Sequence, residues 1–504
     1  MRLIPPAISD VRDLANALEL GIEEAELEDY RVLLDDIMKT YERVDELSLG
    51  DQLSPKSSER SSTEIRSRGE CSLGWTVRTS IKERHSGRLE GKCIAVKDNI
   101  SLAGVPLLNG SRIMEGFVPT VDATVVTRIL AEGGEIVGKT AVPGFCVDGG
   151  GCTGYPEPQP SNPHDPDRMP GASSSGSAVV LVDGEADIAL GGDQGGSIRL
   201  PAAWSGCTGI KPTFGLVPYT GIFPIEQTLD HVGPMAMTAM DCALALEVIA
   251  GEDNLDPRQS RVPPLPYIAE LEKGVEGLRI GILSEGFGIP GQSEEEVDRS
   301  VDHAIEELSR LGASAATVSV PEHFDGLALW QAVAIEGATR LMLHDNACPI
   351  GSVGHYNTEL ADFYGESLKT KASEFSKTVK VLLLCGEYMA EKYNHKYYAK
   401  AQNLRQWLTS RYDEVFADYD VLAMPTVPFR ALEFPKTDKL ADIYAAAQKN
   451  LINTAPFDLT GHPAISFPVE TRGSLPVGMQ VIGPLGRDDL VLRVAHAYQT
   501  RLGG

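Results

Sequence analysis

The stretch GASSSGSAVVLVDGEADIALGGDQGGSIRLPAAWSGCTGIKPTFG, residues 171–215, decides the fold and the chemistry of this chain. It holds two turns rich in glycine and serine, GASSSGS at 171–177 and GGDQGGS at 191–197, around an apolar segment. Glycines beside a serine let the backbone bend so that several N–H groups point at one spot. An acyl-transfer enzyme needs such donors for the negative oxygen of its tetrahedral intermediate. Such turns are also common in ordinary loops, so a structural role stays open.

Strands and helices alternate on both sides of this stretch. GKCIAVKDNI (91–100), EIVGKT (135–140), GLRIGIL (277–283), SAATVSV (314–320) and DVLAMPTVP (420–428) are typical of buried strands, and ATVVTRILAEGG (123–134) and EEEVDRSVDHAIEELSRLG (294–312) of helices. This alternation predicts an α/β fold with a single large, mixed, mostly parallel β-sheet covered by helices.

Three further segments complete the predicted domain organisation. Residues 1–50 have helical periodicity, and the serine-rich residues 51–70 are typical of a linker. Residues 71–504 form the main domain, from which a helical excursion departs at about 326–417. We expect the N-terminal helices to serve as an arm of a homodimer.

Composition and charge exclude several classes of partner. The 504 residues are 42% hydrophobic and carry a formal net charge of −26, which repels phosphate backbones and anionic lipid. We therefore expect no nucleic-acid partner and no membrane partner. The N-terminus lacks the apolar core of a signal peptide, and the eight cysteines form no metal-binding pattern. Cysteines in apolar surroundings, such as Cys242 and Cys385, are expected to be buried free thiols, and the protein is expected to be cytoplasmic.

A serine nucleophile needs a base. The histidines are scattered, with only His231 and His462 in glycine- or proline-rich segments, and no G-x-S-x-G elbow occurs. A lysine that burial keeps neutral is the alternative base. Lys97 fits because it follows the apolar run CIAV, although an ordinary lysine at the end of a strand would look the same.

The motifs together resemble the amidase signature family. The matching pieces are KDNI at 97–100, GASSSGS at 171–177, GGDQGGSIRLPAAW at 191–204, GIKPTFG at 209–215, and the C-terminal TGHPAISFPV and LPVGMQVIG. GDQGGS, together with GLVPYTGIFPIEQT at 215–228, is most similar to bacterial amidases that accompany nitrile hydratases. Ala172 and Ser175 replace glycines of the family pattern, which leaves the mapping of the other residues intact.

The resemblance implies a role for each of a set of residues. It implies a triad of a lysine, a serine in a cis peptide and a nucleophilic serine, which map to Lys97, Ser173 and Ser197. It assigns an oxyanion hole to the N–H groups of Gln194, Gly195 and Gly196, with Ser197 itself nearby. Supporting roles fall to the hydrogen-bonding serines Ser174 and Ser177 and to a buried ion pair between Asp193 and Arg199.

The implied mechanism has two steps and uses no metal and no organic cofactor. Lys97 takes a proton through Ser173 while Ser197 attacks the amide carbon, and water later releases the acid. By position we expect an apolar substrate pocket, with Trp330 as a lid on the helical excursion, so the acyl group is an aromatic or medium aliphatic one. The expected lining residues are Phe145, Cys146, Leu229, Trp330 and Ile452.

Other functions remain open at this stage. The same triad can hydrolyse carbamates, esters or anilides, and the signature is shared with the amide-hydrolysing subunit of a tRNA-dependent amidotransferase. GGEIVGKT at 133–140 also satisfies the G-x-x-x-x-G-K-T pattern of a phosphate-binding loop. A helix precedes it and AVPGFCVDGGG follows it, which is the wrong context, and we expect a strand there with Lys139 in a structural role.

Overall fold

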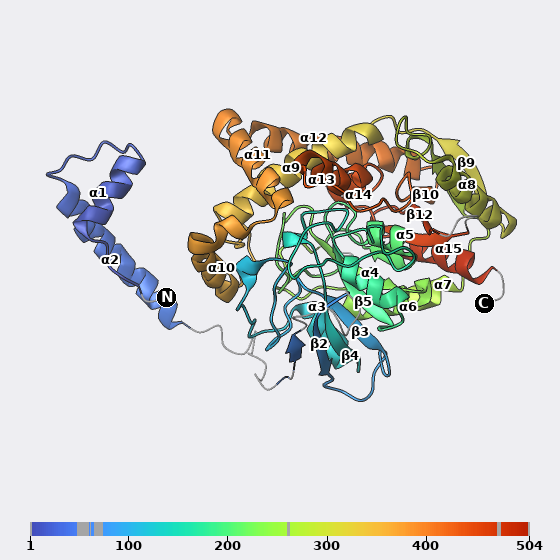
Figure 1. Cartoon of the computed structure of the whole chain (residues 1–504), viewed down its shortest axis with the longest axis horizontal. Helices are drawn as coiled ribbons and strands as arrows, with labels where there is room; N and C mark the ends of the chain where they lie inside the picture. Colours follow the sequence, from blue (N-terminus) through green and yellow to red (C-terminus); the bar gives the residue numbers. More distant parts are fainter. Residues whose placement is uncertain are drawn as a thin grey trace. The chain divides into compact units, whose positions relative to one another are not determined.

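The computed structural model in Figure 1 describes residues 3–47, 60, 62–64, 74–259, 263–470 and 475–501. The chain divides into two compact units, residues 1–55 and 56–504. The first unit holds helices α1 (Ile8–Ala17) and α2 (Leu27–Glu46), which bury Val11, Ala15 and Leu27. Of the expected linker 51–70, all but residue 60 and the short strand β1 (Ser62–Glu64) lies outside the described residues.

The second unit is built on one mixed sheet of twelve described strands, in the order β1-β2-β4-β3-β5-β7-β6-β11-β12-β10-β8-β9. The α/β architecture is confirmed, but the expectation of mostly parallel pairing is not. Only β4-β3-β5 and β10-β8-β9 pair in parallel among the described strands, and the pairs between and outside them are antiparallel. The strands are β2 (Trp75–Ile81), β3 (Cys93–Lys97), β4 (Glu135–Thr140), β5 (Ile188–Asp193), β6 (Thr208–Lys211), β7 (His231–Ala236), β8 (Arg279–Leu283), β9 (Ser314–Val318), β10 (Val421–Pro425), β11 (Ala464–Val469) and β12 (Val477–Ile482).

The connections explain where the pairing is parallel. A parallel neighbour needs a crossover, usually a helix, and such helices join β3 to β4 and β8 to β9: α3 (Thr124–Ala131) and α8 (Glu295–Arg310). Residues 212–230, between β6 and β7, contain no helix, and these two strands are antiparallel. The strand–helix alternation in the sequence therefore predicted the parallel parts of the sheet and missed its antiparallel centre.

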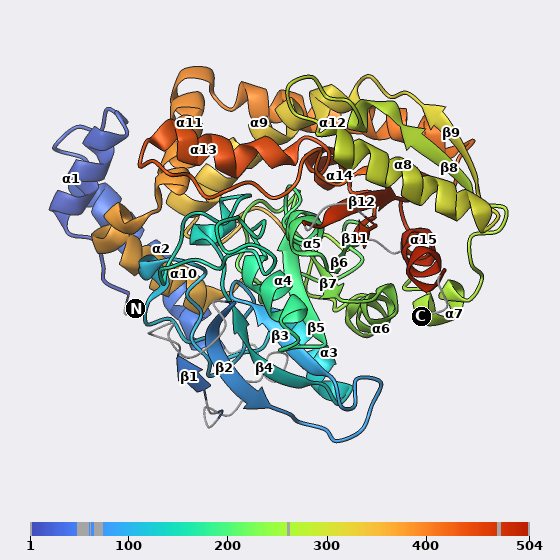
Figure 2. The ribbon, with the colours of Figure 1, turned by 45° about the vertical axis from the view of Figure 1, so that its right-hand side comes forward.

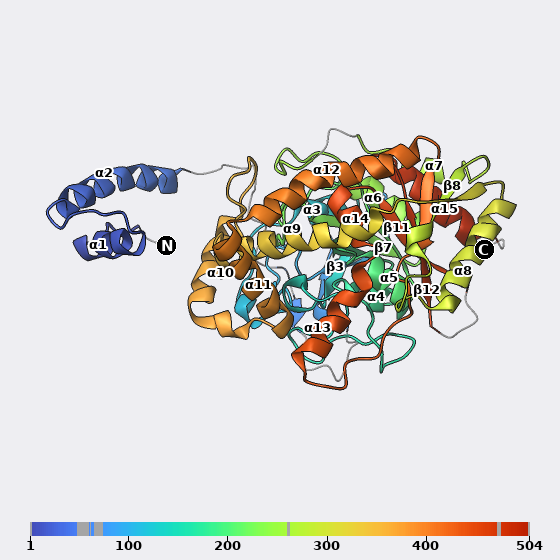
Figure 3. The ribbon, with the colours of Figure 1, turned by 90° about the horizontal axis from the view of Figure 1, so that it is seen from above.

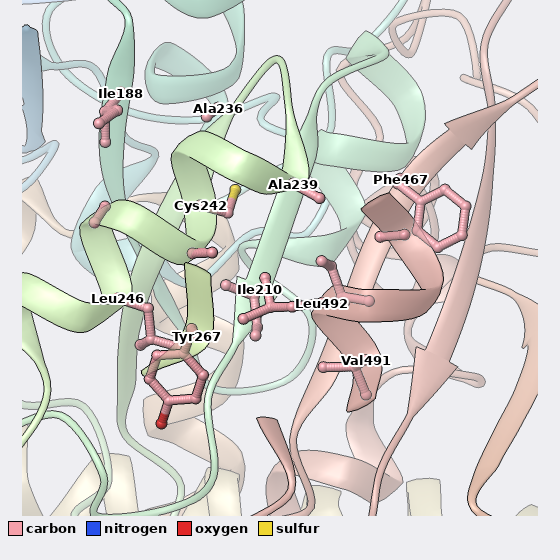
Figure 4. Close-up of a cluster of buried hydrophobic side chains, with 14 of the residues drawn as sticks. Ile188, Ile210, Ala236, Ala239, Cys242, Leu246, Tyr267, Phe467, Val491 and Leu492 are labelled. Atoms are coloured by element: carbon pink, nitrogen blue, oxygen red, sulfur yellow. The ribbon is translucent and has the colours of Figure 1, made fainter. Parts of the chain in front are cut away.

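Helices cover both faces of the sheet, so the strands are apolar on both sides. Along β3, Ile94 and Val96 pack into the core on one face, while Ala95 faces a separate cluster on the other. The first face is covered by α3, α6 (Ala239–Ile249), α7 (Tyr267–Leu271), α8 and α15 (Asp488–Thr500). Figure 4 shows part of this core, where Leu246 of α6 lies beside Tyr267 of α7, and Leu492 of α15 lies beside Ile210 of β6.

The opposite face carries the remaining helices. α4 (Ser175–Val182) and α5 (Arg199–Ser205) pack on one part of it, as Figure 2 shows, and α14 (Ala455–Thr460) on another. Residues 323–416 form four long helices, and α9 and α12 run side by side in Figure 3 and contact each other. Their bounds are α9 (His323–Leu343), α10 (Thr358–Lys371), α11 (Lys377–Tyr393) and α12 (Lys396–Phe416), with α13 (Leu440–Gln448) following later in the chain.

The phosphate-loop pattern forms a strand. Residues 135–140 are β4, and Lys139 is fully buried with its amine 2.8 Å from a carboxylate oxygen of Asp98. A backbone paired within a sheet cannot wrap around phosphates, and this lysine has its own counter-ion. The NTPase alternative is therefore wrong.

Of the expected buried thiols, Cys242 is buried and Cys385 is exposed, on α11. No helix among the described residues has the length and apolar character needed to cross a membrane. Within the same residues, no group of three or more histidine, cysteine or acidic side chains can hold a metal ion.

Candidate functional site

The site forms where two parallel strands end. β3 and β5 are parallel neighbours, so their last residues, Lys97 and Asp193, lie at the same edge of the sheet. The glycine-rich turn follows β5 directly, and the serine run begins α4, which packs against both strands. Residues separated by about a hundred positions therefore meet at one edge.

The amine of Lys97 is fully buried beside a serine hydroxyl. Its Nζ lies 2.8 Å from Ser173 Oγ and donates a second hydrogen bond, of 3.0 Å, to the carbonyl of Gly192. No carboxylate of the described chain forms an ion pair with it, in contrast to Lys139. Burial lowers the pKa of Lys97 because removal from water disfavours the charged form. A neutral lysine in contact with a hydroxyl can take up a proton.

The serine run is hydrogen-bonded to the ends of the strands. The peptide bond between Ala172 and Ser173 is cis. Ser174 Oγ donates to the carbonyl of Gly192 (3.2 Å), and Ser177 Oγ donates to that of Leu190 (3.1 Å). The backbone N–H of Ser174 donates to the carbonyl of Ser197 over 3.1 Å, which brings the two serine-containing turns together.

Three consecutive N–H groups were expected to form an oxyanion hole, and one of them is already engaged. The N–H of Gly196 donates to a carboxylate oxygen of Asp193, 2.5 Å away. The N–H groups of Gln194, Gly195 and Ser197 make no hydrogen bond within the described part of the chain. The free donors are therefore those of Gln194, Gly195 and Ser197, and Gly196 is corrected to a supporting residue of the turn.

A buried charge network holds this turn. Arg199 forms an ion pair with Asp193 at 3.0 Å, and the arginine keeps the pKa of Asp193 well below its usual range in spite of burial. Arg199 also donates to Asp458, to Gln480 (2.8 Å) and to the carbonyl of Thr454 (3.0 Å). Burial and the nearby Asp193 raise the pKa of Asp458 well above its ordinary value. The turn is thus fixed to segments more than 250 residues further along the chain.

A cavity opens beside Ser197, which is only partly buried. Of the predicted lining residues, Cys146, Leu229 and Trp330 line it. Trp330, on α9, packs so closely on the turn that a Cβ atom at Gly195 would lie 2.6 Å from its ring. Other lining residues are Ile225, Ile335, Leu382, Tyr444 and Leu451. Large apolar side chains dominate these walls, which suits an apolar acyl group.

Two predicted lining residues, Phe145 and Ile452, do not line this cavity. Phe145 is fully buried among aromatic rings, with its centroid 5.4 Å from that of Phe223. Phe145 and Cys146 both have positive φ, so the chain turns sharply and only Cys146 reaches the cavity. Ile452 follows the short 3₁₀-helix that ends at Leu451, and a step along such a helix turns the side chain by about 120°.

The residues that brace the turn from a distance were not among the predicted site residues. Asp458, Gln480 and Tyr219 contact it, and Gln480 and Tyr219 lie within the quoted motifs LPVGMQVIG and GLVPYTGIFPIEQT. The motifs flagged the segments, but spacing along the chain gave no way to pair them. His231 and His462 are buried, with pKa values lowered by burial, and neither lines the cavity.

Comparison with known proteins identifies the class to which this fold and site belong. The Amidase family model matches residues 76–492, and the chain belongs to this family. An enantioselective amidase of Rhodococcus rhodochrous is 41% identical over 99% of this chain and 96% of its own length.

Solved structures agree with this assignment. A glutamyl-tRNA(Gln) amidotransferase subunit of Thermotoga maritima has a TM-score of 0.71 and 30% identity over 86% of this chain and 89% of its own. A peptide amidase in complex with the inhibitor chymostatin has a TM-score of 0.69 and 28% identity, and the match covers 83% of this chain and 84% of that one.

Proposed function

We propose that this chain hydrolyses small aromatic or aliphatic carboxamides to the acid and ammonia or an amine, through an acyl-enzyme on Ser197. The observation that carries the proposal is the fully buried amine of Lys97, which has no ion-pair partner in the described chain and lies 2.8 Å from Ser173 Oγ. A buried amine without a counter-ion is stable only when neutral, and a neutral amine is a base.

The proposed first step is attack by Ser197 on the amide carbon. Ser197 Oγ passes its proton to Ser173 Oγ, whose own proton moves to the lone pair of Lys97. The negative oxygen of the tetrahedral intermediate accepts hydrogen bonds from the free N–H groups of Gln194, Gly195 and Ser197. The relay then returns a proton to the leaving nitrogen, and the amine departs.

The second step repeats the path with water. Water loses its proton to the relay and attacks the acyl carbon, and Ser197 is reprotonated as the acid leaves. Water supplies the proton that replaces the one lost to the leaving nitrogen, and between these steps the transferred proton is held by Ser173, Ser197 or Lys97. The cycle requires no metal or organic cofactor.

A panel of benzamide, propionamide, an acyl anilide, ethyl carbamate and a simple ester tests the proposal and ranks the alternative substrates. We expect hydrolysis of at least one amide, with a burst of product that equals the number of active sites when deacylation is slow. Ser197→Ala should abolish every activity in the panel. Normal turnover by Ser197→Ala would refute the proposal.

The amidotransferase role is the second candidate, because a glutamyl-tRNA(Gln) amidotransferase subunit shares the fold. The extent of the matches favours the self-sufficient amidase. The Rhodococcus amidase aligns with 99% of this chain, whereas the match to a glutamyl-tRNA(Gln) amidotransferase subunit from Picosynechococcus covers 82%. Glutaminase activity that appears only with a second protein bound would reverse this choice.

The remaining proposals concern assembly and location. The chain is proposed to form a homodimer through α2, whose exposed apolar side chains recur at helical spacing: Tyr30, Leu33, Leu34, Ile37, Tyr41 and Val44. A cytoplasmic location is supported by the seven described cysteines, all of which are free thiols. Light scattering of the full chain and of an Ile37→Glu variant tests the dimer.

A further inference from the structure

The side chain of Gln194 is held in place by its amide nitrogen alone. Its Nε2 donates a hydrogen bond of 3.0 Å to the hydroxyl of Tyr219. The backbone carbonyl of the same residue accepts a hydrogen bond of 2.5 Å from the indole N–H of Trp330. Gln194 is therefore fixed at both its main chain and its side chain, and the orientation of its amide is set by Tyr219.

The other side-chain atom of Gln194 lacks a partner. Its Oε1 is buried and accepts no hydrogen bond within the described chain, and the residue is only 6% exposed. A buried acceptor left unsatisfied is unfavourable, because it has lost its hydrogen bonds to water. Gln194 lines the same cavity as Ser197, three residues away. The vacant acceptor therefore belongs to a residue of the cavity wall that also carries Ser197.

A second vacant acceptor lies nearby. Asn99 is fully buried, its Oδ1 has no partner in the described chain, and its Nδ2 lies 3.5 Å from the same Tyr219 hydroxyl. A Cβ atom at Gly192 would lie 3.5 Å from Lys97 Nζ and 3.6 Å from Asn99 Nδ2. The amide of Asn99 therefore lies close to the amine of Lys97. Two buried amide side chains, each with an unpartnered carbonyl oxygen, thus share the hydroxyl of Tyr219 through their nitrogens.

From this arrangement we infer that Gln194 Oε1 accepts a hydrogen bond from an N–H group of the scissile amide and so selects amides over esters. The inference rests on the proposed function. An amide that carries an N–H group can satisfy this oxygen, whereas an ester has no such group. Fixing the N–H group also fixes the nitrogen lone pair, which must point at the relay to receive its proton.

The test compares two substrates that differ by one N–H group, N-methylbenzamide and methyl benzoate. Gln194→Met keeps the size of the side chain and removes the acceptor. We expect its kcat/KM to fall on the order of tenfold for the amide, mostly in kcat, and to change little for the ester. Gln194→Glu retains an acceptor oxygen and should bring the ratio of the two substrates back toward that of the unaltered protein.

Two further variants separate selection from support of the turn. Tyr219→Phe frees the amide of Gln194, so the loss should again be confined to the amide substrate. Gln227→Met alters a glutamine that does not line this cavity and should leave both rates unchanged. Equal losses on amide and ester by Gln194→Met, or no loss on either, would overturn the inference. Retained activity in Ser197→Ala would instead refute the proposed function.

Discussion

The amine of Lys97 and the hydroxyl of Ser173 lie 2.8 Å apart although 76 residues separate them in the sequence. Lys97 ends β3, and Ser173 lies just before α4, which packs against that strand. The contact therefore depends on the packing of one helix on one strand, and both elements are almost entirely buried. Substitution of Lys97 tests whether the amine in this contact is neutral and acts as the base.

Lys97→Met should abolish amide hydrolysis and make the protein more stable at neutral pH. The pKa of Lys97 is lower in the folded protein than in the unfolded chain, so the unfolded chain binds this proton more readily. The free energy of unfolding therefore rises with pH until the pH reaches the pKa of an unfolded lysine, about 10.4. The advantage of methionine should therefore be largest at low pH and vanish near that value. Thermal melts from about pH 6 to about pH 10 measure this difference.

Lys139→Met is the matched control for this experiment. Lys139 is equally buried, but its removal leaves Asp98 without its cation, so this variant should be less stable than the unaltered protein at neutral pH. If both lysine variants lose stability alike, Lys97 is a structural ion and the base assignment is wrong.

Arg199→Met should destabilise the protein by about 3–5 kcal/mol, because it strands the buried charge of Asp193. Denaturant unfolding measures the loss. Arg299→Met removes an exposed arginine that pairs with Glu295 and Glu296, and it should cost less than about 1 kcal/mol. A loss for Arg199→Met as small as that of the surface variant would contradict a bracing role.

Trp330→Phe keeps an aromatic wall but leaves the carbonyl of Gln194 without its donor. We expect kcat/KM for the best amide to fall on the order of tenfold, since a buried hydrogen bond of the turn is lost. The control is Trp407→Phe on α12, where the residue is 37% exposed and the rate should not change. Unchanged kinetics in Trp330→Phe would show that the indole N–H does not hold the turn.

Leu451→Ala and Ile452→Ala distinguish the wall of the cavity from the core behind it. Leu451 lines the cavity, so its truncation should raise the relative kcat/KM for bulkier acyl groups. Ile452→Ala should lower stability by about 2–5 kcal/mol and leave the preference among acyl groups unchanged. A series of straight-chain and aromatic amides measures the preference, and a shift produced by Ile452→Ala alone would contradict this view of the wall.

Local patterns in the sequence predicted the local structure well. The runs around Ile94, Ile280 and Leu422 form strands because burial on both faces requires continuous apolar residues. The antiparallel centre of the sheet was missed, since none of the strands predicted from the sequence covers β7, β6, β11 or β12. The expected position of Phe145 failed because a positive φ at two successive residues has no signal in the sequence.

For the site, the motifs predicted which segments take part, but not which residues of these segments contact one another. Lys97, Ser173 and the turn at 191–197 come from the resemblance, and their catalytic roles stay predictions. Asp458 and Gln480 reach Arg199 across more than 250 residues, and only the folded sheet brings them there. The engaged N–H of Gly196 depends on the orientation of one carboxylate, which no motif encodes.

The close fit of Trp330 on Gly195 bears on how a substrate enters. The indole is both hydrogen-bonded to the turn and in contact with it, so α9 cannot swing away as a hinged cover without pulling apart the loop that would hold the reacting oxygen. A substrate must therefore enter past the parts of the cavity wall that make no hydrogen bond to the turn, among them Tyr444 and Gln448 of α13. Mutations that widen the entrance without harming turnover are therefore to be sought on α13.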